Sequence, residues 1–173
     1  MCGIYGLIDL NKKTNIEVLE KMNRIMAHRG PDGEGYGIYE AANARVGLGH
    51  RRLSIIDLTA GGSQPKTFGS LHITFNGEIY NYAEIKKELE QKSHAFDSHS
   101  DTEVILHAYK EWGPAALQKF IGMFALAIYD EAEQKLFACR DRAGVKPFLY
   151  YYKYGLFLFG SELKALLQHP AVE

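Results

Sequence analysis

The sequence lacks the features of several protein classes. Its 173 residues include only two cysteines, Cys2 and Cys139, too few for a disulfide scaffold or a cysteine-rich zinc module, which favours a reducing, cytoplasmic setting. The formal net charge is −1, so no strong field attracts nucleic acid or anionic lipid. No apolar run approaches the roughly 20 residues that span a bilayer. We therefore expect neither a nucleic-acid partner nor a membrane partner.

Metal chemistry also has little support in the sequence. The seven histidines are scattered along the chain, and His94 and His99 stand five residues apart, a loose spacing for a zinc pair. We therefore expect no metal site.

The composition is that of a folded chain. Hydrophobic residues make up 46% and charged residues 24% of the sequence, which is ordinary for a globular protein. No repeat, low-complexity segment or linker divides the chain; the loop-like residues 60–65 are too short for one. We therefore expect one domain over residues 1–173.

Strands and helices are expected in runs rather than in regular alternation. Hydrophobic patterning predicts strands at residues 3–9, 36–39, 45–50, 71–75, 123–129, 136–140, 148–152 and 156–159. The last four strands follow one another too closely for parallel crossovers, so antiparallel pairing is favoured. This order predicts an α+β domain, with antiparallel sheets and helices packed outside them.

Helix starts are predicted from a capping pattern in which a polar residue is followed by glutamate three positions later. The pairs are Thr14 with Glu17, Asn81 with Glu84, and Ser100 with Glu103. A final helix is expected from Ser161.

Cys2 is the first candidate for chemistry. Removal of the initiator Met1 would make it the N-terminal residue, which combines a thiol nucleophile with an amine base. The free amine and the thiol have ordinary pKa values of about 7.7–8.0 and 8.5, both close to neutral pH. Taken alone, Cys2 fits better as a small buried residue at the start of a strand.

The segment Asn76-Gly77-Glu78 follows a predicted strand and has two interpretations. Asn-Gly is a common turn signal. An asparagine amide beside an exposed backbone N–H is also what an oxyanion hole needs, and Glu78 adds a carboxylate. Arg52 could be a solvated residue or a bidentate holder of a carboxylate, and Asp101 a helix-cap neighbour or a partner for a cation.

Six motifs taken in order are far more specific than any one of them. Together they resemble the class II glutamine amidotransferase domain, the N-terminal-nucleophile glutaminase, and most closely the glutaminase half of glutamine-dependent asparagine synthetases. The motifs are Cys2-Gly3-Ile4, His28-Arg29-Gly30-Pro31-Asp32, Arg52-Leu53-Ser54-Ile55-Ile56-Asp57, Asn76-Gly77-Glu78-Ile79-Tyr80-Asn81, Ser100-Asp101-Thr102-Glu103 and Arg140-Asp141…Gly144…Lys146-Pro147.

The resemblance implies a four-layer αββα sandwich, the Ntn-hydrolase fold. It implies that Cys2 attacks the side-chain amide of glutamine, with its own amine as base, to give a γ-glutamyl thioester, glutamate and ammonia. Asn76 and the Gly77 N–H would bind the oxyanion. Arg52 would hold the α-carboxylate of the substrate, and Glu78, Gly77 and Asp101 its α-amino group. Arg51 matches no functional position of the family, and Cys139 is interpreted as core.

The sequence departs from the asparagine synthetases in two ways. The sequence has no Ser-Gly-Gly-x-Asp-Ser loop of the synthetase domain, so we expect no synthetase domain in this chain. We expect no cofactor in this domain either, because ATP and Mg²⁺ would belong to the missing synthetase domain. The ammonia acceptor would then be a synthetase domain or subunit elsewhere, and a homo-oligomer stays open. The chain also begins with Met1, whose retention would leave an inactive precursor.

Two alternatives remain open at this point. One is a non-catalytic module that binds glutamine or a partner protein with Met1 unprocessed. The other is an N-terminal-nucleophile hydrolase for a different amide, against which Arg52 speaks, because a substrate without an α-carboxylate would leave it unpaired.

Overall fold

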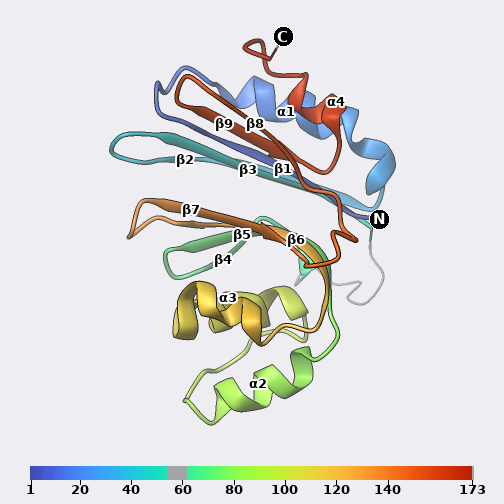
Figure 1. Cartoon of the computed structure of the whole chain (residues 1–173), viewed down its shortest axis with the longest axis vertical. Coiled ribbons are helices and arrows are strands. Elements are labelled where there is room, and N and C mark those ends of the chain that lie inside the picture. The colour runs from blue at the N-terminus through green and yellow to red at the C-terminus, as the bar shows by residue number, and fades with distance from the viewer. Residues whose placement is uncertain (54–61, 173) are drawn as a thin grey trace.

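The fold has four layers, seen edge-on in Figure 1. The computed structural model describes residues 1–53 and 62–172. Helices α1 (Ile16–Ile25) and α4 (Leu163–Leu166) cover one sheet, and helices α2 (Tyr82–Glu90) and α3 (Asp101–Trp112) cover the other, while the two sheets face each other between them. The predicted αββα sandwich of the α+β class is confirmed.

Each sheet is antiparallel throughout its described strands. The first has the order β2-β3-β1-β9-β8 and the second the order β4-β5-β6-β7. The strands are β1 Gly3–Asp9, β2 Gly33–Glu40, β3 Arg45–Arg52, β4 Lys66–Phe68, β5 Leu71–Ile79, β6 Gly122–Asp130, β7 Lys135–Arg140, β8 Leu149–Lys153 and β9 Leu156–Gly160. Short 3-10 helices occur at Ala27–Arg29 and Gly113–Gln118.

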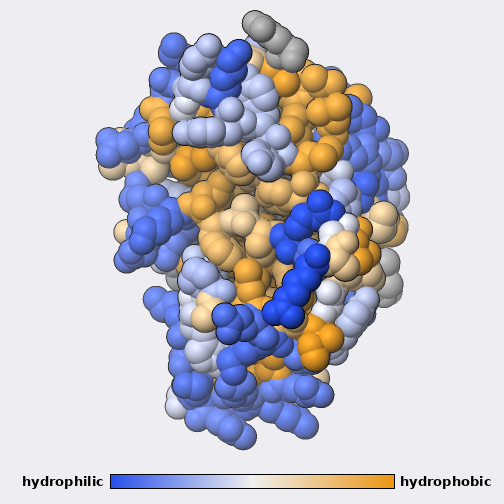
Figure 2. Space-filling view, in the orientation of Figure 1, coloured by the Kyte–Doolittle hydropathy of each residue, from blue (hydrophilic) through white to orange (hydrophobic). Residues whose placement is uncertain are grey.

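Three apolar interfaces hold the four layers together, because both faces of each sheet must be covered. The interface under α1 contains Leu7, Leu19 and Leu158. The interface between the sheets contains Ile4, Leu48 and Ala125, and the one above α2 and α3 contains Ile73, Leu89 and Leu106. On the face shown in Figure 2, hydrophobic residues are exposed where the two sheets lie, whereas the end of the molecule formed by α2 is hydrophilic.

Two of the three predicted side-chain caps are wrong. Ser100 does cap α3, since its Oγ accepts from the Glu103 N–H at 3.3 Å. Thr14 instead donates to Asp9 Oδ2 at 2.8 Å, and helix α1 begins after Asn15. Asn81 precedes α2, but its side chain bridges the Lys119 carbonyl and the Ile121 N–H. In both cases a tertiary partner replaces the local bond.

Other predicted elements differ in their bounds. The last helix begins at Leu163 rather than Ser161, and its buried side is formed by Ala165 and Leu166. Residues 54–61 lie outside the described part of the chain, and with them Ser54-Ile55-Ile56-Asp57 of the predicted motif. Among the described residues, no helix has the length and apolar character needed to cross a membrane.

Candidate active site

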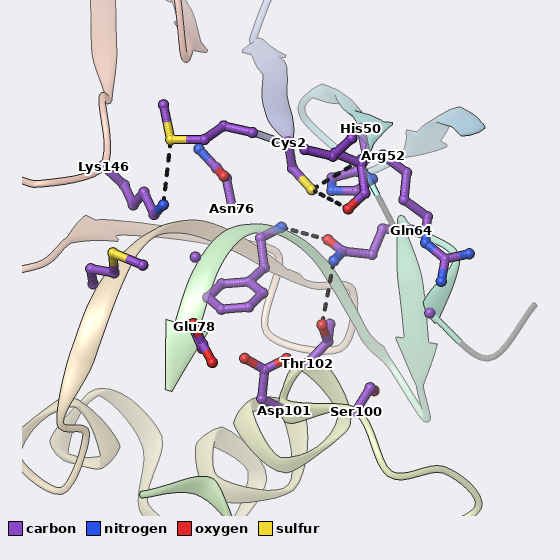
Figure 3. A pocket seen from close by; sticks show the side chains of 16 residues that line it. Cys2, His50, Arg52, Gln64, Asn76, Glu78, Ser100, Asp101, Thr102 and Lys146 are labelled. Atoms are coloured by element: carbon purple, nitrogen blue, oxygen red, sulfur yellow. Dashed lines mark hydrogen bonds between the residues drawn. The ribbon is translucent and has the colours of Figure 1, made fainter. Parts of the chain in front are cut away.

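A cavity of about 160 Å³ opens between the two sheets and the start of α3 (Figure 3). It is lined by Met1, Cys2, His50, Arg52, Leu53, Gly62, Gln64, Phe75, Asn76, Gly77, Glu78, Ser100, Asp101, Thr102, Met123 and Lys146. All six residues predicted from the sequence to form a site are among them. They come from the residue before β1 and from β3, β5 and α3, so only the assembled sandwich brings them together.

Cys2 lies directly before β1, and its sulfur faces this cavity. The register that pairs Gly3 with Arg51 sets it beside the end of β3. Its Sγ accepts from the Leu53 N–H at 3.3 Å and donates to the Leu53 carbonyl at 3.5 Å. Both bonds fix the sulfur at the end of β3, on the side of the cavity.

Arg29 and Asp141, each from one of the six motifs, hold the main chain on opposite sides of the cavity. Arg29 Nε donates to the Cys2 carbonyl at 3.0 Å, and Arg29 Nη1 is anchored to Glu162 at 3.0 Å. Across the cavity, the Asp141 carboxylate accepts from the Phe124, Val145 and Lys146 N–H groups. These motifs shape the walls of the site, and the second also brings Lys146 to its lining.

Asn76 and Gly77 form no turn. Strand β5 continues through them to Ile79, and they pair with Ala125 and Phe124 of β6. The turn interpretation is therefore wrong, because a neighbouring strand satisfies the backbone. Gly77 is required here, since a Cβ at its position would lie 2.2 Å from the Met123 carbonyl oxygen.

The Asn76 amide has an unusual environment. The residue is 2% exposed, and its Nδ2 finds no hydrogen-bond partner among the described residues. Buried donors are nearly always paired, so an unpaired one in a cavity wall marks a place for a ligand acceptor. Asn76 Nδ2 and the Cys2 thiol line the same cavity, as a nucleophile and an oxyanion donor must.

Asp101 has a role beyond the helix start. Ser100 caps α3, while Asp101 Oδ2 accepts from the Ile79 N–H of β5 at 3.1 Å. Burial raises the pKa of the Asp101 carboxyl from 3.8 to about 6, with a further push from nearby Glu78, and the hydrogen bonds from Ile79 and Thr102 oppose this. Since burial disfavours the charged form of this carboxylate, a cation bound beside it would stabilise that form.

Asp101→Asn is expected to stabilise the protein at neutral pH. The pKa of Asp101 is higher in the folded protein than in the unfolded chain, so folding favours the neutral carboxyl. The free energy of unfolding that this adds is fully present below about pH 4 and is lost as pH rises through about 6. An amide stays neutral, so the variant should gain about 1–2 kcal/mol at pH 8 and little at pH 4. Urea unfolding at both pH values measures this; an equal difference at pH 4 and pH 8 would contradict it.

The neighbouring arginines Arg51 and Arg52 point to opposite faces of β3, as alternation along a strand requires. Arg52 lines the cavity, and a Cβ on Gly62 would lie only 2.4 Å from its Nη2. Arg51 forms an ion pair with Glu34 in a different hollow, beside Asn23. Leaving Arg51 out of the site therefore agrees with its position.

Sequence reasoning assigned no role to several lining residues, His50 among them. His50 is buried, and burial lowers the pKa of its imidazole to about 4, so it is neutral. Its place two residues before Arg52 on one strand face was a usable signal. Thr102 and Lys146 stand within two of the six motifs, but neither was assigned a role, and Gln64 comes from a segment with no chemical motif of its own.

Met1 occupies one wall of the cavity. Its Sδ accepts from Lys146 Nζ at 3.5 Å, and both residues line the cavity. Lys146 is buried. Within residues 1–53 and 62–172, no group of three or more His, Cys, Asp or Glu side chains is arranged to hold a metal ion.

Comparisons with known proteins agree with this geometry. Residues 1–173 match the family model of the glutamine amidotransferase domain. The glutamine-hydrolysing asparagine synthetase 3 of Bacillus subtilis is 41% identical over 179 residues, which cover 100% of this chain and 28% of that protein. Asparagine synthetase 2 of the same organism is 42% identical over 176 residues, covering 98% of this chain and 23% of that protein. The chain thus spans less than a third of either relative.

A solved structure supports the fold. The chain is similar to the glutamine phosphoribosylpyrophosphate amidotransferase of Bacillus subtilis, with a TM-score of 0.77 and 19% identity over 95% of this chain and 43% of that one. At this identity the likeness concerns the arrangement of sheets and helices alone.

Proposed function

From the family to which this chain belongs, the glutamine amidotransferase domains, we propose that it hydrolyses the side-chain amide of glutamine to glutamate and ammonia. The observation that carries the proposal is that the Cys2 thiol and Asn76 Nδ2, which has no hydrogen-bond partner among the described residues, share one cavity with a cationic Arg52 and an anionic Asp101. A free amino acid with a side-chain amide matches this set.

The nucleophile becomes competent when Met1 is removed. The new α-amine of Cys2 takes the thiol proton, and Sγ attacks the side-chain amide carbon of glutamine. Asn76 Nδ2 and the Gly77 N–H stabilise the oxyanion of the tetrahedral intermediate. The protonated amine then gives its proton to the departing nitrogen, ammonia leaves, and a γ-glutamyl thioester remains. Water attacks the thioester, which releases glutamate and restores the thiol.

The ends of the substrate are recognised by charge. Arg52 offers a fork of N–H donors to the α-carboxylate. Asp101 and Glu78 lie on the opposite side of the cavity from Cys2 and accept from the α-ammonium group (Figure 3). The amide of glutamine then points toward Cys2.

The ammonia acceptor would be a synthetase domain or subunit that activates a carboxylate. The support for this is that the two Bacillus subtilis relatives are glutamine-hydrolysing asparagine synthetases and are much longer than this chain. We propose that ATP and Mg²⁺ act in that partner and that this domain needs no cofactor. A reducing cytoplasm would keep the Cys2 thiol free.

The test of the proposed function is glutamate release from glutamine by protein whose loss of Met1 is verified by mass spectrometry. Glutamate should form in proportion to the processed fraction. Glutamine binding without glutamate formation by fully processed protein would instead support a non-catalytic module. The position of Met1 in the cavity wall favours that second function only for the unprocessed chain.

The affinity for glutamine should weaken in acid. Since the pKa of Asp101 is about 6 in the free site, the carboxylate that binds the α-ammonium group is lost as pH falls below that value. We expect KM to rise up to about tenfold per pH unit below pH 6, while Asp101→Asn has a raised KM with little pH dependence. Steady-state kinetics from pH 5 to 8 measure both; a wild-type KM that stays flat through pH 6 would contradict it.

A further inference from the structure

The side chain of Gln64 connects the two elements that carry opposite ends of the site. Its Oε1 accepts from the Phe75 N–H of β5 at 2.6 Å, and its Nε2 donates to Thr102 Oγ1 of α3 at 3.3 Å (Figure 3). Gln64 is 9% exposed, and both ends of its amide are used. A single buried amide thus joins a strand and a helix that are far apart in sequence.

The need for this link follows from the sheet topology. Lys66, the first residue of β4, pairs with Ile73 of β5. Strand β4 therefore runs alongside β5 from Leu71 only as far as Ile73. Beyond that point β5 is an edge strand among the described residues, and no strand of residues 1–53 or 62–172 pairs with the Phe75 N–H on that side. Gln64 supplies the missing acceptor, which an unpaired buried amide requires.

The two bonds of Gln64 end next to proposed substrate contacts. Phe75 directly precedes Asn76, the proposed oxyanion donor, and Thr102 directly follows Asp101, the proposed acceptor for the α-ammonium group. We propose, resting on the function proposed above, that Gln64 is a positioning residue that fixes the separation between these two contacts. Glutamine must reach both at once, so a small change in separation misplaces the reacting amide.

The two halves of the link can be tested separately. Gln64→Met keeps the length of the side chain and removes both bonds, so kcat should fall and KM should rise, each by about 10-fold or more. Thr102→Val is nearly isosteric and removes only the bond to α3. It should therefore raise KM by about 3–10-fold and leave kcat within about twofold, because β5 keeps its acceptor.

Thr14→Val is the matched control. Thr14 is a buried threonine whose hydroxyl donates to Asp9, at the end of β1 opposite to Cys2. The Thr14→Val variant should lower the midpoint of thermal unfolding as much as Thr102→Val does, with kcat and KM unchanged. If Thr102→Val and Thr14→Val alter KM equally, or if Thr102→Val leaves KM unchanged, the positioning role is wrong. The KM of Thr102→Val therefore tests the positioning role even if Gln64→Met does not fold.

A measurement independent of activity separates this inference from the proposed function. Amide hydrogen exchange should show faster exchange of the Phe75 N–H in Gln64→Met, with the Ile73 N–H little changed. Unchanged Phe75 protection would overturn the link even in an active enzyme. A processed wild-type chain that releases no glutamate would overturn the proposed function, while faster Phe75 exchange would still support the link.

Discussion

Cys2→Ala in the processed chain is expected to abolish glutamate release, with a loss of at least about 10³-fold in kcat. The α-amine stays in place, but no thioester forms without the sulfur, and ammonia must then be displaced by water alone. Glutamine should still bind, because Arg52 and Asp101 are untouched. Glutamate release and calorimetric titration with glutamine measure the two effects.

Cys139→Ala provides the matched control, since it removes the other cysteine of the chain. Cys139 lies within β7, packs against the core, and burial raises the pKa of its thiol to about 12, which leaves it unreactive at neutral pH. Activity should stay within about twofold of wild type. Residual activity in Cys2→Ala equal to that of Cys139→Ala would remove the basis of the proposed mechanism.

Asn76→Ala is expected to lower kcat by about 10²–10³-fold, with a much smaller change in KM. The Asn76 Nδ2 group has no partner among residues 1–53 and 62–172, so we expect it to bond the substrate oxygen, in a contact that strengthens as negative charge develops there. Initial rates over a range of glutamine concentrations separate kcat from KM.

Asn11→Ala tests whether loss of an asparagine side chain is harmful in itself. Asn11 is exposed, lies beyond the far end of β1, and donates to the Tyr154 carbonyl at 2.9 Å. Its kinetics should match those of wild type. If Asn76→Ala raises KM and leaves kcat intact, Asn76 binds the ground state of the substrate and the oxyanion role fails.

Much of the fold could be predicted from the sequence because its signals are local. Strand β1 has the predicted bounds, and every other predicted strand overlaps an observed one. Short connections correctly predicted the antiparallel pairing of β6 with β7 and of β8 with β9, whereas β7 and β8 lie in different sheets. Hydrophobic periodicity specifies these elements, since a strand or helix must place its apolar residues on a buried face whatever its neighbours are.

The residues of the site were predicted from motif order, and the cavity places them together, although their roles await the experiments above. Local reasoning was wrong where a partner outside the expected turn or helix competes with the local bond. Asn76-Gly77 became strand because β6 pairs with it, and the side chains of Thr14 and Asn81 bond Asp9, Lys119 and Ile121 instead of capping helices.

The sequence alone therefore determined the classes and order of elements and the chemical groups available to the site. Tertiary structure alone decided which groups are left unpaired in the cavity, as with the Asn76 amide, and which residue without a motif, Gln64, joins β5 to α3. The reason is physical. Whether a donor is paired, and how strongly burial shifts a pKa such as that of Asp101, depends on atoms that the chain brings close only when the four layers assemble.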